Sequence, residues 1–337
     1  MAGAKVGNVE EIKLQVFSST NELIEILNKK CNKATDQPYP AMYSSIFGGI
    51  VLDPIMMMIP IDDHMVHRGH GVFDTAIIFD GFLYGLDAHL DRFLRSASVA
   101  KISPPFPLST LRSILIQLTA KSKCKNGTLR YWLSAGPGNF SLSSSGCPTT
   151  AFYAIVIKHD FSLWKEGVKV ITSSIPMKTP LFATTKSVNY LPNVLAQLEA
   201  EEKKAFASIW VDDEGYIAEG PNMNVAFVNH ERELVIPKFD KILAGCTENR
   251  LVELAPKLID KGHLKAVRTA DTSIEEAKAA AEMMFVGSSL PIAPIIMWDG
   301  KPIGNGKVGE LTLALSDLLW NDMGAGPETH RIRIIYE

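Results

Sequence analysis

The sequence predicts an α+β protein of two domains, and three observations support this. The chain has 337 residues, which is enough for two domains that each bury a core. Its first half combines a hairpin pattern with amphipathic helices, whereas its second half alternates strand and helix patterns more densely. The segment Asp160 to Gly167 separates the two patterns and is interpreted as the linker. We therefore expect an N-terminal appendage helix in residues 1–40, a small α+β domain in residues 41–160 and a larger, β-rich domain in residues 161–337.

The first half contains clear helix-start and turn signals. Ser19 to Glu22 forms a capping-box pattern, which opens an amphipathic helix from Asn21 to about Cys31. Asp80-Gly81 is a two-residue turn between apolar runs and predicts a hairpin. Asp87 is expected to cap the helix that follows the hairpin. The elements expected here are strands at Met42–Phe47, Val72–Phe79, Phe82–Leu86, Thr128–Ala135 and Thr150–Lys158, and helices from Asp87 to about Val99 and from Ser109 to about Ser122.

Two stretches of the first half invite a functional interpretation. The Gly- and Ser-rich loop Gly136 to Gly146 is long, and we interpret it as a flap on the substrate side. His64, His67 and His70 precede the hairpin, but their spacing lacks the helical pair with a carboxylate partner that is typical of zinc sites. We therefore predict no metal site there.

The second half is predicted to alternate strands with helices. Gly245-Cys246-Thr247 opens one of these helices, and a glycine and a hydroxyl at a helix N-terminus suit either phosphate binding or an ordinary helix cap. Phe285 to Ser289 ends a strand with exposed donors, which is a second candidate phosphate contact. The expected strands are Val168–Ser174, Ser208–Val211 and Leu234–Ile236, and the expected helices are Val194–Lys204, Gly245 to about Ile259, and Glu310 to about Asp322.

The composition is that of a soluble globular protein, with 46% hydrophobic and 21% charged residues. The formal net charge is -3 and the basic residues are scattered, so the sequence argues against binding to nucleic acid or to an anionic membrane. Its apolar runs are all too short to span a membrane.

The four cysteines are far apart and lack paired spacing or a neighbouring histidine cluster. They are interpreted as free thiols in a reducing compartment, with neither a disulfide framework nor a zinc site. The first 15 residues include Glu10 and Glu11 and have the pattern of neither a signal peptide nor a transit peptide. We therefore expect a cytoplasmic protein, although a plastid precursor that had lost its transit peptide would look the same.

Lys186 is the only charged residue between Lys178 and Glu199. Its neighbours are apolar, hydroxyl and amide side chains, so we expect it to be at least partly buried. Burial favours the neutral amine, which is the nucleophile that condenses with a carbonyl group. The alternative is an ordinary lysine at a strand end.

Glu219 lies where a strand is expected to end and a Gly-Pro bend to begin. That position suits a carboxylate that points into a cleft. Pyridoxal phosphate (PLP) needs both a lysine for its aldehyde and a carboxylate that keeps its ring nitrogen protonated. Lys186 and Glu219 are candidates for these two groups.

Three motifs together resemble the class IV aminotransferases, the fold-type IV PLP enzymes. They are Thr185 to Leu191, Glu219-Gly220 with Asn224 five residues after the glutamate, and His89-Leu-Asp-Arg92. The likeness runs from about Asp62 to Gly309 and is nearest to the plant D-amino-acid transaminase and aminodeoxychorismate lyase group. It implies fold type IV, a homodimer, and a PLP cofactor in the cleft between the two domains.

The resemblance also assigns roles to residues of this chain. Lys186 is the catalytic lysine, Glu219 holds the ring nitrogen, and Tyr190 reaches the ring hydroxyl. Arg92 binds the phosphate, for which the fork of an arginine is well suited. The other implied cofactor-binding residues are Asn224, Cys246, Thr247, Ser288 and Ser289.

The substrate side departs from the bacterial D-amino-acid transaminases. These carry a tyrosine at the position of Phe73 and an arginine at the position of Ala135, and both hold the substrate carboxylate. Branched-chain aminotransferases instead place an arginine at the position of Arg130. We therefore expect Arg130 to bind the carboxylate beside Phe73 and Trp132; the alternative is a structural salt bridge with Asp74.

The sequence thus predicts a transaminase that acts on amino acids, D-amino acids foremost, with a 2-oxo acid acceptor. A lyase that forms 4-aminobenzoate and pyruvate from aminodeoxychorismate stays open, as does a branched-chain L-amino-acid aminotransferase. A silent PLP-binding protein is the alternative that is not an enzyme.

Overall fold

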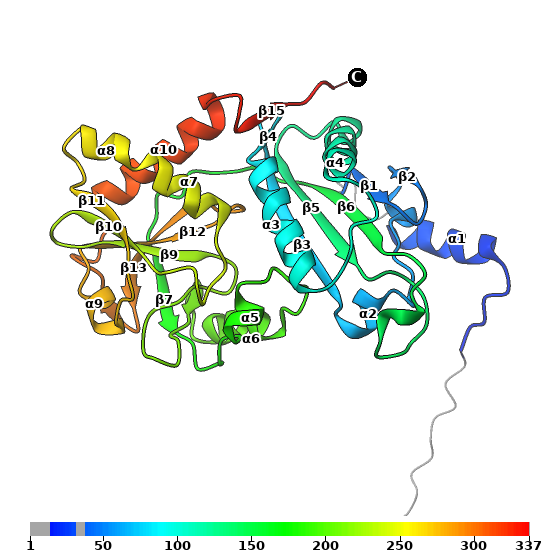
Figure 1. Cartoon of the computed structure of the whole chain (residues 1–337), viewed down its shortest axis with the longest axis horizontal. Helices are drawn as coiled ribbons and strands as arrows, with labels where there is room; N and C mark the ends of the chain where they lie inside the picture. Colours follow the sequence, from blue (N-terminus) through cyan, green and yellow to red (C-terminus); the bar gives the residue numbers. More distant parts are fainter. Residues whose placement is uncertain (1–13, 32–37, 337) are drawn as a thin grey trace, which may run out of the picture.

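The structure is a computed structural model that describes residues 14–31 and 38–336. Two mixed sheets lie in different halves of the molecule, with α3 (Leu86–Val99) at the boundary between them (Figure 1). The α+β class predicted from the sequence is confirmed. Among the described residues, every helix is too short or too polar to cross a membrane.

The first sheet has the strand order β15-β4-β3-β5-β6-β1-β2, and all its neighbouring strands are antiparallel. α3 and α4 (Leu108–Ser122) pack on it around a core that includes Phe93, Leu115 and Phe152. The strands are β1 (Ala41–Ser44), β2 (Gly49–Val51), β3 (Gly71–Phe79), β4 (Phe82–Tyr84), β5 (Gly127–Ser134), β6 (Ala151–Lys158) and β15 (Arg331–Arg333).

The second sheet has the order β11-β10-β9-β12-β13-β7-β8, and it mixes parallel with antiparallel pairs. Its two faces support separate cores, one of which is closed by Leu311, Leu315 and Leu319 of α10 (Glu310–Ala325), as predicted. The strands are β7 (Val168–Thr172), β8 (Ala207–Ile209), β9 (Asn224–Val228), β10 (Glu233–Ile236), β11 (Ala266–Thr269), β12 (Glu282–Val286) and β13 (Ile292–Trp298), and β14 (Lys301–Pro302) pairs with β13.

The remaining helices are short or lie at the edges of the two halves. They are α1 (Thr20–Cys31), α2 (His64–Arg68), α5 (Pro180–Ala183), α6 (Leu191–Glu202), α7 (Cys246–Leu254), α8 (Pro256–Asp260) and α9 (Ile274–Lys278).

Two local predictions in the first half are confirmed. The amide of Glu22 donates to Ser19 Oγ over 3.3 Å at the start of α1, as the capping-box pattern requires. β3 and β4 are joined by Asp80 (φ 46°) and Gly81 (φ 79°), the left-handed pair that a tight hairpin turn needs.

Two predicted helix ends are wrong. α3 begins after Gly85, whose φ of 64° turns the chain, and Asp87 lies inside the first turn, where it pairs with Arg112 (Nε–Oδ1 2.7 Å). The helix predicted to run to Ile259 is interrupted, because Pro256 lacks an N–H and starts the separate helix α8.

The chain end returns to the first half of the molecule. After α10, β15 pairs with β4 and becomes the edge of the first sheet, near the C-terminus in Figure 1. Tyr84 of β4 donates to Asp322 of α10 (2.6 Å), which fastens the two halves together. The domain division at residues 41, 160 and 337 otherwise stays a prediction, with residues 1–13, 32–37 and 337 outside the described part.

Candidate active site

A cavity of about 600 Å³ lies between the two sheets and receives side chains from both. A smaller space shares Lys186 and Tyr190 with it and includes Glu219. Of the residues predicted from sequence, the larger cavity is lined by Phe73, Arg92, Arg130, Lys186, Tyr190, Asn224, Cys246, Thr247, Ser288 and Ser289.

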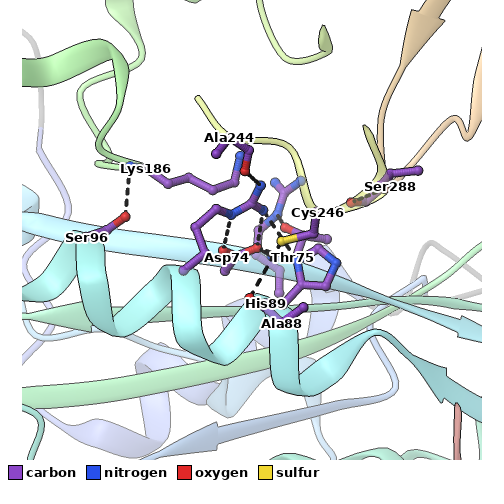
Figure 2. A network of polar contacts seen from close by, with 12 residues as sticks. Asp74, Thr75, Ala88, His89, Ser96, Lys186, Ala244, Cys246 and Ser288 are labelled. Atoms are coloured by element: carbon purple, nitrogen blue, oxygen red, sulfur yellow. Dashed lines mark hydrogen bonds and ion pairs between the residues drawn. The ribbon is translucent and has the colours of Figure 1, made fainter. Parts of the chain in front are cut away.

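Lys186 is held by its backbone and leaves its amine free. Its carbonyl accepts from Phe73 N (2.9 Å) on β3, and its amide donates to Ser96 Oγ (3.1 Å) on α3, as Figure 2 shows. Nζ lies 3.4 Å from Tyr190 Oη and 4.8 Å from the centre of the Phe73 ring. In the described part of the chain, Nζ forms no ion pair. The half-buried amine is therefore available as a nucleophile.

Glu219 is a buried carboxylate that lacks a cation in contact among the described residues. Burial raises its pKa to about 7, although Lys178, the Leu243 amide, Lys186 and Arg92 act in the opposite direction. Its one hydrogen bond comes from Leu243 N (3.3 Å). A protonated ring nitrogen would supply the missing positive charge.

The Gly220-Pro221 bend fixes Glu219 relative to Lys186. The Gly220 amide donates to Met223 O (2.8 Å), so the chain reverses and Glu219 pairs with Asn224 across a short β-bridge. Asn193 in the first turn of α6 donates to Pro221 O. Because α6 begins directly after Tyr190, this bond ties the lysine segment to the bend.

An anion seat, formed by Gly245, Thr247, Gly287, Ser288 and Ser289, lines another part of the cavity. The N-terminus of α7 supplies free N–H groups, since Gly245 at its N-cap makes no side-chain cap bond. Thr247 Oγ1 and Ser288 Oγ lie 3.1 Å apart. A side chain at Gly245 would collide with Asn224 Oδ1, which explains the glycine.

Arg92 lies beside the anion seat, but much of its guanidinium is already engaged. Nε and Nη2 donate to the two oxygens of Asp74 (2.9 and 2.7 Å), and Nη1 donates to Ala244 O (3.1 Å). His89 Nδ1 reaches the same carboxylate (2.8 Å). Arg92 therefore has only its remaining Nη hydrogens for an anion.

Arg130 does not pair with Asp74, so the structural salt bridge considered above is absent. The two residues stand out of register, since Arg130 lies opposite Thr75 and donates to its Oγ1 (3.1 Å). Its guanidinium carbon lies 5.7 Å from the centre of the Phe73 ring. In the described chain, Arg130 has no carboxylate partner, so the fork is available to a ligand.

Trp132 is the predicted site residue that the structure does not bring to the cavity. It packs instead with Met42, Ala151 and Tyr153 in a separate apolar cluster. The loop from Gly136 to Gly146 contacts α2 through a bond from Arg68 Nη2 to Phe140 O (2.7 Å), and its role as a flap stays a prediction.

His64 and His70 face each other beside α2, with 3.1 Å between their Nδ1 atoms. Over the described ranges, we find no cluster of three or more His, Cys, Asp or Glu side chains arranged to hold a metal ion.

Residues 71–298 match the family model described as amino-transferase class IV. The chain belongs to the class IV aminotransferases.

This class IV aminotransferase is 58% identical over 301 residues to the chloroplastic D-amino-acid transaminase of Arabidopsis thaliana, a match that covers 89% of this chain and 81% of the relative. It is 27% identical over 280 residues to the D-alanine aminotransferase of Bacillus licheniformis, covering 82% and 96%. The branched-chain amino acid aminotransferase of T.th., solved with pyridoxamine 5'-phosphate, superposes with a TM-score of 0.82 at 20% identity and covers 89% and 100%. Fold type IV is therefore confirmed.

As a class IV aminotransferase, the chain uses PLP, and the residues present fit that cofactor. An unpaired amine, a buried carboxylate without a contacting cation, and a helix N-terminus with two hydroxyls answer its aldehyde, ring nitrogen and phosphate in turn.

Sequence reasoning missed several residues that shape the site. Asp74 and His89 hold Arg92, and Thr75 holds Arg130. Both arginines needed a partner once buried, which is a signal that the sequence carried. Leu243, which donates a backbone N–H to Glu219, had no such signal because any residue type could do this.

Proposed function

We propose that this chain transfers the amino group of D-amino acids to a 2-oxo acid, with PLP held in the cavity between the two sheets. The observation that carries this proposal is the meeting of Lys186, Glu219 and the anion seat around one cavity space. The choice of D-amino acids is supported by the names of the Arabidopsis and Bacillus relatives.

When bound, PLP supplies an aldehyde for amines and a ring that withdraws electrons from the substrate Cα. Lys186 Nζ is the base that removes the Cα proton and the acid that returns it on the product side. Tyr190 Oη, 3.4 Å from this amine, orients it. Glu219 keeps a proton on the ring nitrogen, and the anion seat with Arg92 holds the phosphate.

An amino-acid panel tests this proposal. We expect 2-oxo acid product from D-amino acids at rates at least about tenfold above those from their L-enantiomers, since the catalytic amine can reach Cα from one face only. An aminodeoxychorismate assay run in parallel measures 4-aminobenzoate. Faster turnover of L-branched-chain substrates, or of aminodeoxychorismate, would overturn the proposed substrate class while leaving the cofactor chemistry intact.

Arg130 is the residue we propose for the substrate carboxylate. It lies beside Phe73, in the same cavity as Lys186, and its fork can hold two carboxylate oxygens at once. Thr75 fixes the orientation of the fork through Nε, which leaves both terminal nitrogens free.

Arg130→Lys is expected to lower kcat/KM for amino acids by about 10- to 100-fold, because lysine keeps the charge but loses the two-pronged grip. PLP binding and thermal stability should stay near wild type. Arg95→Lys, at an exposed position of α3, is the matched control and should match wild type in all three measurements. An Arg130→Lys enzyme that melts early with intact kinetics would show that Arg130 is scaffolding.

The homodimer implied by the family resemblance is also a proposal. It is supported by six large apolar side chains that α5, α6 and their flanks leave exposed next to the lysine segment, namely Leu181, Phe182, Leu191, Val194, Leu195 and Leu198. A surface of this kind favours association. Sedimentation equilibrium should give twice the chain mass, and a monomer at micromolar concentration would contradict it.

For location, the name of the Arabidopsis relative supports a plastid over the cytoplasm expected from the sequence. A fluorescent fusion of the whole chain, imaged against chlorophyll, separates the two.

A further inference from the structure

A buried charge cluster lies directly beside the anion seat. Asp74 on β3 is fully buried and is contacted by two basic side chains of α3. Arg92 reaches both of its oxygens (2.7 and 2.9 Å) and His89 Nδ1 reaches Oδ1 (2.8 Å), as Figure 2 shows for Asp74 and His89. One carboxylate thus serves two bases, which are themselves almost completely buried.

The charges of this cluster do not cancel at neutral pH. Burial alone would raise the pKa of Asp74, but Arg92 and His89 hold it well below its usual range. Burial alone would lower the pKa of His89, but Cys246 and Asp74 outweigh burial and raise it to about 9. With a neutral thiol, two cations face one anion, and a buried excess charge is unfavourable unless something pairs with it.

The α7 N-terminus is the element toward which this excess charge is directed. Cys246, the first residue of α7, places its sulfur next to the His89 ring and 3.7 Å from Ala88 O on α3 (Figure 2). Thr247, the next residue, belongs to the anion seat, and Arg92 and Cys246 both line the cavity there. The cluster therefore adds positive charge to a place that the helix N-terminus already makes favourable for anions.

We propose that His89 is a second cation of the anion seat: held by Asp74, it supplies the positive charge that balances the phosphate of PLP. His89 is a positioning residue, because it acts through Asp74 and the end of α7 without lining the cavity. The inference rests on the proposed function in one respect, namely that the anion is the phosphate of PLP. It assigns to the histidine a share of the charge that would otherwise fall to Arg92 alone.

The pH dependence follows from the groups around His89. These are Asp74 on β3, Arg92 on its own helix, Cys246 on α7 and Tyr131 on β5. Since the pKa of His89 is raised to about 9, its charge is present below that pH and is lost above it. The pKa of Cys246 is lowered: burial would raise it, but the positive charges of His89 and Arg92 prevail. A thiolate there would repel phosphate, so both groups weaken phosphate binding as the pH rises.

The test compares the affinity of the apoenzyme for PLP with its affinity for pyridoxal, which lacks the phosphate. The amine of Lys186 and the ring contacts are common to both ligands, so the ratio of the two dissociation constants isolates the phosphate. In wild type, we expect the preference for PLP to fall about tenfold between pH 7.5 and pH 10. A preference that stays constant across this range would overturn the proposal without any variant.

His89→Asn is the matched variant, because the amide can keep a hydrogen bond to Asp74 while removing the charge. At pH 7.5 it should weaken PLP binding about tenfold, leave pyridoxal binding unchanged and flatten the fall above pH 8. His263→Asn, at an exposed histidine, is the control and should match wild type. Cys246→Ser removes the thiolate and should retain the fall with pH.

The outcomes separate this inference from the proposed function. If neither ligand forms a chromophore with Lys186, the proposed function fails. If both do so but His89→Asn keeps the wild-type preference for PLP, His89 is structural. If the fall with pH disappears in Cys246→Ser, the thiolate is responsible and the proposal is also overturned.

Discussion

Lys186→Ala is expected to lower kcat by about 10⁴-fold or more, because it removes both the amine that binds the cofactor aldehyde and the only base placed to move the Cα proton. Nζ faces Tyr190 and the Phe73 ring and is free of carboxylates among the described residues, so no neighbouring base stands ready to replace it. PLP should still bind, but only non-covalently, through the anion seat and Glu219. Stopped-flow absorbance with a D-amino acid measures the loss.

Borohydride reduction of the wild-type holoenzyme, followed by peptide mass spectrometry, identifies the lysine directly. The adduct is expected on the peptide that contains Lys186. Lys178 is the informative competitor, since its Nζ lies 5.0 Å from the centre of the Tyr190 ring and its side chain lines the same small space. An adduct on Lys178, or a Lys186→Ala enzyme that keeps its turnover, would contradict the assignment.

The parts of the fold that the sequence predicted are those set by local chemistry. The Asp80-Gly81 turn and the Ser19 cap follow from backbone preferences of a few neighbouring residues, and the structure has both. The C-terminal strand β15 has no local signal of this kind, because its place beside β4 depends on how α10 carries the chain back across the molecule. The end of α7 was predictable from Pro256, which the apolar periodicity of the segment obscured.

The candidate site shows the same division. A lone lysine in an uncharged stretch and a glutamate before a Gly-Pro bend carry their chemistry in the sequence, and the structure brings both to adjoining spaces. Trp132 was placed beside Arg130 by strand alternation alone. That rule gives the face of the sheet but not the position along it, and Trp132 packs over β6 away from the cavity.

Glu219→Gln is expected to lower kcat by about 10²- to 10³-fold and, at the same time, to stabilise the apoprotein at pH 8. The loss of rate follows because a neutral amide cannot hold a proton on the ring nitrogen. The gain in stability follows because the buried carboxylate, with one hydrogen bond from Leu243, is costly to ionise in the empty site.

The pH window fixes the sign of the stability change. Burial raises the pKa of Glu219 from 4.5 to about 7 in the folded apoprotein. Between these values the unfolded chain ionises while the folded chain keeps its proton, so stability falls as pH rises from about 4.5 to 7 and stays low above it. The difference corresponds to about 3 kcal/mol at most. Glu219→Gln should lose this fall, so that it melts above wild type at pH 8 and together with it at pH 4.5.

Glu248→Gln is the matched control, since it makes the same isosteric change on a second buried carboxyl nearby. Both Glu248 oxygens lack a hydrogen-bond partner in the described structure, and burial together with the charge of Glu219 raises its pKa well above the usual value. Glu248 is therefore already neutral at neutral pH, and its amide variant should keep kcat within about twofold of wild type. Equal losses of kcat in the two variants would mean that Glu219 contributes packing, and a Glu219→Gln enzyme with wild-type kcat would exclude its role at the ring nitrogen.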